Sequence, residues 1–81
     1  MTTEGRAEAL FASSLQPSDR ASAAQVAAAI GTSLLANGGE RGCAAVVAAE
    51  FGDHPDTAAE RMRWALRLAA DPAGAGSAAA A

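Results

Sequence analysis

The residues best suited to chemistry in this chain lie around its single histidine, His54. Two carboxylates stand close to it, Asp53 and Asp56, and the three side chains together offer ligands for a metal ion. Metal sites usually need three or four ligands, and these residues also suit the start of a helix. Pro55 fits the first helical position, and Asp56 fits the positive end of the helix dipole. We therefore expect Asp53 or His54 to cap a helix through its side chain, and we expect no metal ion or other cofactor.

Cys43 is the second candidate, because a thiolate near the start of a helix is a good nucleophile. Its one possible histidine partner, His54, lies past the far end of the same predicted helix. At a rise of ~1.5 Å per residue the two are separated by about 15 Å, too far for a hydrogen bond. Cys43 also falls in an apolar stripe, which favours a place in the core. No other residues pair a nucleophile with a base, so the sequence predicts that the protein is not an enzyme.

A longer segment resembles the helix-turn-helix of DNA-binding proteins. From Val47 to Leu68 the chain has an alanine, then Gly52 four residues later, a short turn and a second helix. The segment departs from that motif at Asp53 and late in the recognition helix, where apolar residues are expected. The candidate DNA contacts in this alternative are Arg61, Arg63 and Arg67. Only Arg63 and Arg67 share a helix face, and nearby carboxylates would repel phosphates.

Charge and composition restrict the partners further. The net charge of −3 and the pI near 4.8 disfavour a general nucleic-acid or anionic-membrane binder, because such proteins need a positive surface. A single cysteine excludes an internal disulfide. The chain opens without a signal-peptide pattern, and no apolar run approaches the ~18 residues of a membrane span. We therefore expect a cytoplasmic protein without a membrane partner.

The elements that must position these residues are all predicted to be helices. Alanine, the best helix former, is the commonest residue, and tyrosine is absent. Apolar periodicity and end signals predict helices over residues 4–15, 22–37, 41–51 and 55–70. The predicted fold class is therefore all-α, a compact bundle of four helices of which the third is short. Residues 1–70 should form a single domain, and residues 71–81 a disordered tail rich in alanine and glycine.

Local signals predict where these helices begin and end. Pro17 should stop the first helix, since the residue before a proline avoids the α region. Ser22 and Gln25 form a capping box at the start of the second helix, and Gly38-Gly39 ends it. Gly52 should end the third helix in the left-handed conformation, which glycine adopts easily.

Three large apolar residues do not fit the faces predicted to be buried. On the fourth helix the predicted buried residues are Ala58, Met62, Ala65, Leu66 and Ala69. Trp64 and Leu68 lie off that stripe, and Leu35 lies among small residues on a second face of the helix over residues 22–37. These three, Leu35, Trp64 and Leu68, are the candidate interface residues. If they form one patch, two copies could meet there about a two-fold axis with Arg61 at the rim, or another protein could occupy it.

Several segments of the chain resemble a known group of sequences. They are LFASSLQPSD (residues 10–19), RGCAAVVAAEFGDHP (residues 41–55) and RMRW (residues 61–64). Through them the chain resembles a group of short actinobacterial proteins that have no assigned function. The resemblance implies a bacterial cytoplasmic protein with a native domain, and it implies no activity and no site residues.

These observations favour one class of function over two others. We expect a non-catalytic helical module that acts by protein–protein interaction, as a small regulatory or accessory protein. Its partner is either a second copy of the chain, which gives a homodimer, or another protein. The alternative is a helix-turn-helix DNA-binding regulator that uses residues 47–68, and an enzyme is a distant third.

Overall fold

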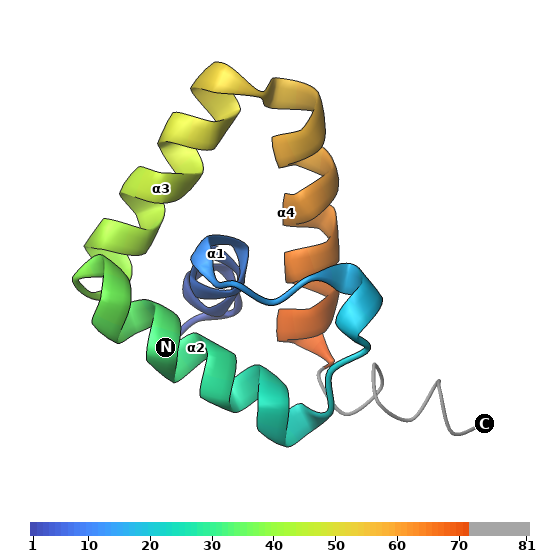
Figure 1. Ribbon diagram of the computed structural model, residues 1–81. Coiled ribbons are helices and arrows are strands. Elements are labelled where there is room, and N and C mark those ends of the chain that lie inside the picture. Colours follow the sequence, from blue (N-terminus) through green and yellow to red (C-terminus); the bar gives the residue numbers. More distant parts are fainter. Residues whose placement is uncertain (72–81) are drawn as a thin grey trace.

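Four α-helices and one short 3₁₀ turn make up the computed structural model, which describes residues 1–71 (Figure 1). In chain order they are α1 (Thr3–Ala12), the turn η1 (Pro17–Asp19), α2 (Ala23–Asn37), α3 (Gly39–Asp53) and α4 (Pro55–Ala70). The predicted all-α bundle of four helices is confirmed. The tail predicted to be disordered lies, from residue 72 onwards, outside the described residues.

The first helix, α1, runs through the middle of the molecule. Figure 1 shows α2, α3 and α4 as three sides of a triangle, with α1 seen nearly end-on inside it, and α1 contacts each of the three. The buried residues of α1 are Gly5, Ala7, Ala9, Leu10 and Phe11. Three of these five are glycine or alanine, which lets several helices approach one short helix closely. The core is therefore built around α1 and does not lie between two layers of helices.

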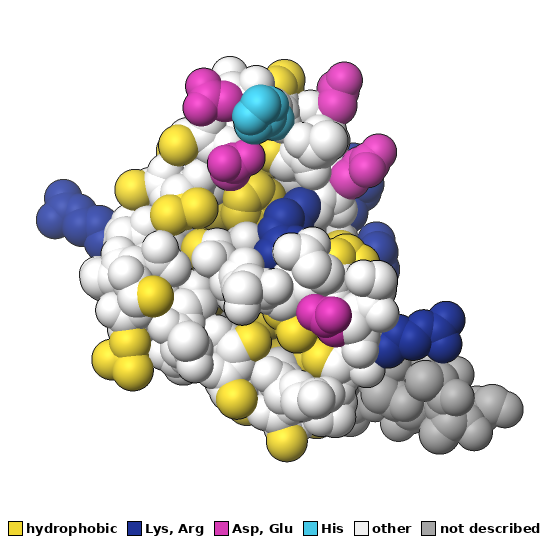
Figure 2. Space-filling view, in the orientation of Figure 1, with side chains coloured by type: hydrophobic (Ala, Val, Ile, Leu, Met, Phe, Trp, Pro, Cys, Tyr) yellow, Lys and Arg dark blue, Asp and Glu magenta, His cyan; other side chains and the backbone are white. Residues whose placement is uncertain are grey.

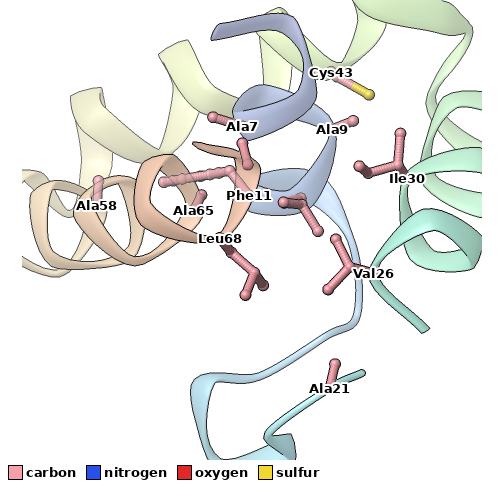
Figure 3. Close-up of a cluster of buried hydrophobic side chains, with 12 residues drawn as sticks. Ala7, Ala9, Phe11, Ala21, Val26, Ile30, Cys43, Ala58, Ala65 and Leu68 are labelled. Atoms are coloured by element: carbon pink, nitrogen blue, oxygen red, sulfur yellow. The ribbon is translucent and has the colours of Figure 1, made fainter. Parts of the chain in front are cut away.

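The buried apolar residues come from every helix, and Ala21 joins them from the segment between α1 and α2. Figure 3 shows Leu68 reaching from α4 into the space between that helix and Val26 of α2. Leu66 was predicted to be buried but is 38% exposed, whereas Leu68 was predicted to be exposed but is only 7% exposed. The three alanines of the predicted stripe are buried as predicted, but the edge of the stripe was wrong, because α4 packs against α1 and also against the segment that follows α1. Its buried side is therefore displaced toward Leu68.

The start of α2 and the turn after it follow the predicted signals. The Ser22 hydroxyl accepts from the Gln25 N–H at 3.2 Å, and the Gln25 side chain accepts from the Ser22 N–H at 2.8 Å. This reciprocal pair is the predicted capping box. Gly38 and Gly39 have φ angles of 81° and 85°, values that favour glycine. These two residues turn the chain so sharply that α3 begins as soon as α2 has ended (Figure 1).

The first helix ends earlier than predicted, at Ala12. Both the N–H and the hydroxyl of Ser13 donate to the Leu10 carbonyl, at 3.1 and 2.6 Å, which competes with continued helix. Pro17 does not stop α1 but begins the turn η1, where its fixed φ is suitable. Residues 13–22, which we call the connector, therefore cross from α1 to α2 and pass over α4.

The third helix is longer than predicted, because Gly52 does not end it. α3 has fifteen residues, as many as α2, and Gly52 lies inside it without a positive φ. The chain breaks at His54, and Pro55 then takes the predicted first position of α4. The predicted side-chain cap is wrong, since His54 makes no side-chain capping bond. Its backbone serves instead: the carbonyl accepts from Ala58 at 2.9 Å, and the N–H donates to Glu50 at 2.7 Å.

Candidate functional site

Cys43 lies inside the fold, as predicted. It is fully buried, and its sulfur lies 3.7 Å from the Ser33 hydroxyl and 3.8 Å from the Ser33 carbonyl oxygen. The Asn37 amide donates to the same carbonyl and hydroxyl, at 2.9 and 3.2 Å. This small polar network joins α2 to α3. His54 lies beyond the far end of α3 and is exposed, so the structure does not bring a nucleophile–base pair together here.

His54 marks an acidic end of the molecule. Glu50, Asp53, Asp56 and Glu60 are all exposed where α3 meets α4, and Figure 2 shows the histidine among acidic side chains there. We call these four residues the acidic corner. Their charge would repel phosphate groups. In a helix-turn-helix the start of the recognition helix contacts the bases. Here that part of α4 belongs to the acidic corner, which disfavours the DNA-binding alternative.

Two further observations concern metals and membranes. Among residues 1–71, no three or more side chains of the metal-binding types lie close enough to hold an ion. Over the same residues, none of the helices combines the length and the apolar character that crossing a bilayer requires.

Arg61 is the main polar link between α4 and α1, a role that the sequence did not suggest. Its Nε donates to the Phe11 carbonyl at 2.8 Å. Its Nη2 donates to the carbonyls of Leu10, Ser13 and Leu15, at 3.3, 2.9 and 2.9 Å. The last carbonyls of a helix have no intrahelical partner. Arg61 therefore satisfies the end of α1 and fixes the connector at the same time.

Aromatic rings and a carboxylate surround the Arg61 guanidinium. Its carbon lies 4.8 Å from the Trp64 ring centroid and 5.7 Å from that of Phe11, distances at which a cation is attracted to the ring face. Burial lowers the pKa of Arg61, and the Glu50 carboxylate acts in the opposite direction. The guanidinium is used within the fold, so Arg61 is unavailable either as a DNA contact or as an interface rim.

The other two candidate DNA contacts, Arg63 and Arg67, are exposed on α4. The three candidate interface residues do not form one patch. Leu35 is 88% exposed on α2, Leu68 belongs to the core, and Trp64 is partly buried against that core. Leu35 and Trp64 also lie on different helices, α2 and α4, which form two sides of the triangle around α1 (Figure 1). The single two-fold patch predicted from the sequence is therefore not assembled.

A pocket of about 590 Å³ lies between the connector and the last turns of α4. Its apolar lining consists of Leu15, Pro17, Ala21, Trp64, Leu68 and Ala70, and its polar lining of Gln16, Arg20, Arg67 and Asp71. We call it the connector pocket. Because Arg61 holds the connector and stacks on Trp64, it positions two walls of this pocket. Sequence reasoning identified Trp64 but missed the pocket, because no pattern places the connector over α4.

No family model, curated protein or solved structure matches this chain.

Proposed function

We propose that this chain is a non-catalytic helical module that acts by pairing with a second protein chain through the outer face of α2. This outer face consists of Ala24, Ala28, Gly31 and Leu35, which recur along one side of the helix and are all exposed. The observation that supports the proposal most is the 88% exposure of Leu35 on a helix of fifteen residues without a single charged side chain.

Such a face is unusual on a surface helix. The solvent side of an amphipathic helix normally carries charged and polar residues. Figure 2 shows the surface over α2 without basic or acidic side chains. A Cβ added to Gly31 would meet no atom within 4 Å, so this part of the face is open. Small side chains along an open face let a partner helix approach closely, and Leu35 offers an apolar anchor at one end.

A second copy of the chain is the partner that this face suits best. Two copies of a chain with a net charge of −3 repel each other, and the repulsion is weakest where neither surface carries charge. A face without charges also cannot form ion pairs with the side chains of a charged partner. It can match itself about a two-fold axis, which is the commonest symmetry of protein pairs. We therefore expect two α2 helices to pack against each other in a homodimer.

Sedimentation equilibrium tests this proposal. We expect the wild-type chain to dimerise, and Leu35→Glu to raise the dimer dissociation constant at least tenfold by placing a carboxylate in an apolar contact. Leu66→Glu is the matched control, because Leu66 is an exposed leucine on α4, away from the outer face. A wild-type chain that stays monomeric at millimolar concentration, or equal effects of the two variants, would refute the proposal.

The positions of Cys43 and His54 support the non-catalytic part of the proposal. The thiol is fully buried and the imidazole lies at the other end of α3, so neither can assist the other in a reaction. The cytoplasmic setting expected from the sequence stays a prediction.

A further inference from the structure

We propose that the connector pocket binds a small carboxylic acid with an apolar body, such as a medium-chain fatty acid. None of the residues that line this pocket belongs to the outer face of α2, and the proposal does not depend on pairing. Three features of the pocket support it: its apolar floor, the charges at its edge and the backbone of Arg20.

The floor and one wall of the pocket are apolar. Leu68 and Ala21 are almost completely buried in the core, and Leu15 and Trp64 pack partly against it. The volume of about 590 Å³ falls within the range of about 300–1,000 Å³ that is usual for small-molecule sites. An aliphatic chain could therefore leave water by entering between the connector and α4. The concave shape suits a small molecule better than the flat surface that a protein partner usually covers.

The charges at the pocket edge favour an anion. Arg20 and Arg67 both line it, together with one carboxylate, Asp71. The residues that line the pocket thus have a positive balance, although the whole chain has a net charge of −3. One further carboxylate, that of Asp19, lies just outside the lining and accepts from the Gln16 N–H at 2.8 Å. Guanidinium groups bind carboxylates with paired hydrogen bonds, which are stronger than those between neutral groups. A ligand with an apolar body and one carboxylate would use both the floor and the edge.

The backbone conformation of Arg20 supports a ligand site here independently of the charges. Arg20 has φ 50° and ψ 54°, and it is the one residue other than glycine with a positive φ among residues 1–71. The left-handed region is costly for a residue with a Cβ, and glycine would occupy it more easily. Residues kept in such conformations cluster at ligand sites. The arginine at this position costs the fold stability, and it is one of the two arginines that line the pocket.

Trp64 makes binding directly measurable. It is the single tryptophan and the chain has no tyrosine, so the emission of the full-length protein comes from a side chain that lines the pocket. We would titrate the protein with three probes of equal chain length, namely octanoate, octan-1-ol and octylammonium, below their micellar concentrations. We expect octanoate to give a saturable change with 1:1 stoichiometry. We expect it to bind about tenfold more tightly than octan-1-ol, while octylammonium binds most weakly.

Three variants separate the proposed contacts from general effects on the fold. We expect Arg67→Gln and Arg20→Gly each to weaken octanoate binding about fivefold or more and to leave octan-1-ol binding within twofold. Arg20→Gly should do so with an unchanged or higher melting temperature, because it relieves the left-handed backbone, so misfolding would not explain the loss. Arg63→Gln, which removes an exposed arginine of α4 outside the pocket, should leave octanoate binding unchanged.

Several results would overturn the proposal. They are the absence of saturable binding, equal affinity for the three probes, or octanoate binding that is the same in Arg67→Gln, Arg20→Gly and the wild type. Competition by inorganic phosphate at concentrations near that of octanoate would also overturn it, because phosphate makes no use of the apolar floor. Leu35→Glu should leave the octanoate titration unchanged, so failure of the pairing proposal and failure of this one can be told apart.

Discussion

Replacing Arg61 is the sharpest test of how this fold is held together. In Arg61→Ala, four backbone carbonyls at the end of α1 and in the connector lose their donor. A hydrogen bond from a charged group contributes about 1.5–3 kcal/mol. The loss of stability should be smaller than the sum of four such contributions, because the four contacts are only partly buried and water can replace some of the lost hydrogen bonds.

Loss of the donors and of the stacking on Trp64 should together cost about 3–4 kcal/mol. A domain of this size has a total stability of roughly 4–12 kcal/mol. The variant should therefore lose about a quarter or more of its free energy of unfolding. At ~4–8 °C per kcal/mol, the melting temperature should fall by about 12–30 °C. Thermal and urea unfolding followed by circular dichroism measure both quantities.

Two further variants identify the cause of the loss. Arg61→Lys keeps the charge but has a single nitrogen, which cannot reach four carbonyls, so it should still cost about 2–3 kcal/mol. Arg63→Ala removes an exposed arginine from the same helix and should stay within about 0.5 kcal/mol of the wild type. If Arg61→Ala lost less than about 1 kcal/mol, or if lysine fully replaced arginine, the role of Arg61 described here would be wrong.

Four other outcomes are expected. Gly52→Ala should stabilise the chain by about 0.5–1 kcal/mol, since this glycine lies inside α3 with open space around it, whereas a true left-handed cap would be destabilised. Gly42→Ala should destabilise by about 2 kcal/mol or more in the same unfolding assay, because the added Cβ would overlap the Asn37 carbonyl in the turn between α2 and α3. Trp64→Ala should cost about 2–3 kcal/mol, less than a fully buried tryptophan, because the ring is only partly buried. In a mobility-shift titration at low salt we expect no specific DNA binding, and binding that weakens in Arg63→Ala and Arg67→Ala would restore the helix-turn-helix alternative.

Local chemistry made some parts of this fold predictable. The capping box of Ser22 and Gln25, the double glycine after α2 and the proline that begins α4 depend on neighbours within a few residues, so the sequence alone shows them. The burial of Cys43 was also predictable, because Cys43 falls in a stripe of apolar residues that recur at helical spacing along α3.

The errors share a different cause, which is packing between distant segments. The buried side of α4 depends on the connector that lies against it, and Arg61 donates to residues that are 46–51 positions away in the chain. No periodicity within α4 contains that information. Gly52 was misread for a related reason, since glycine is favoured at helix ends but is tolerated inside a helix at a modest cost.

The position of Arg61 connects the stability of the fold with the pocket proposed above. The same guanidinium that satisfies the end of α1 also fixes the connector at Ser13 and Leu15 and supports the ring of Trp64. The connector and Trp64 are two walls of the connector pocket, so Arg61 contacts both of these walls. Arg61→Lys, which should remain folded at low temperature, should therefore weaken octanoate and octan-1-ol binding alike, because it loosens the walls without changing the charge at the pocket edge. Arg67→Gln changes that charge and should weaken octanoate binding alone. This contrast separates a residue that shapes the pocket from one that contacts the ligand, and equal behaviour of the two variants would contradict it.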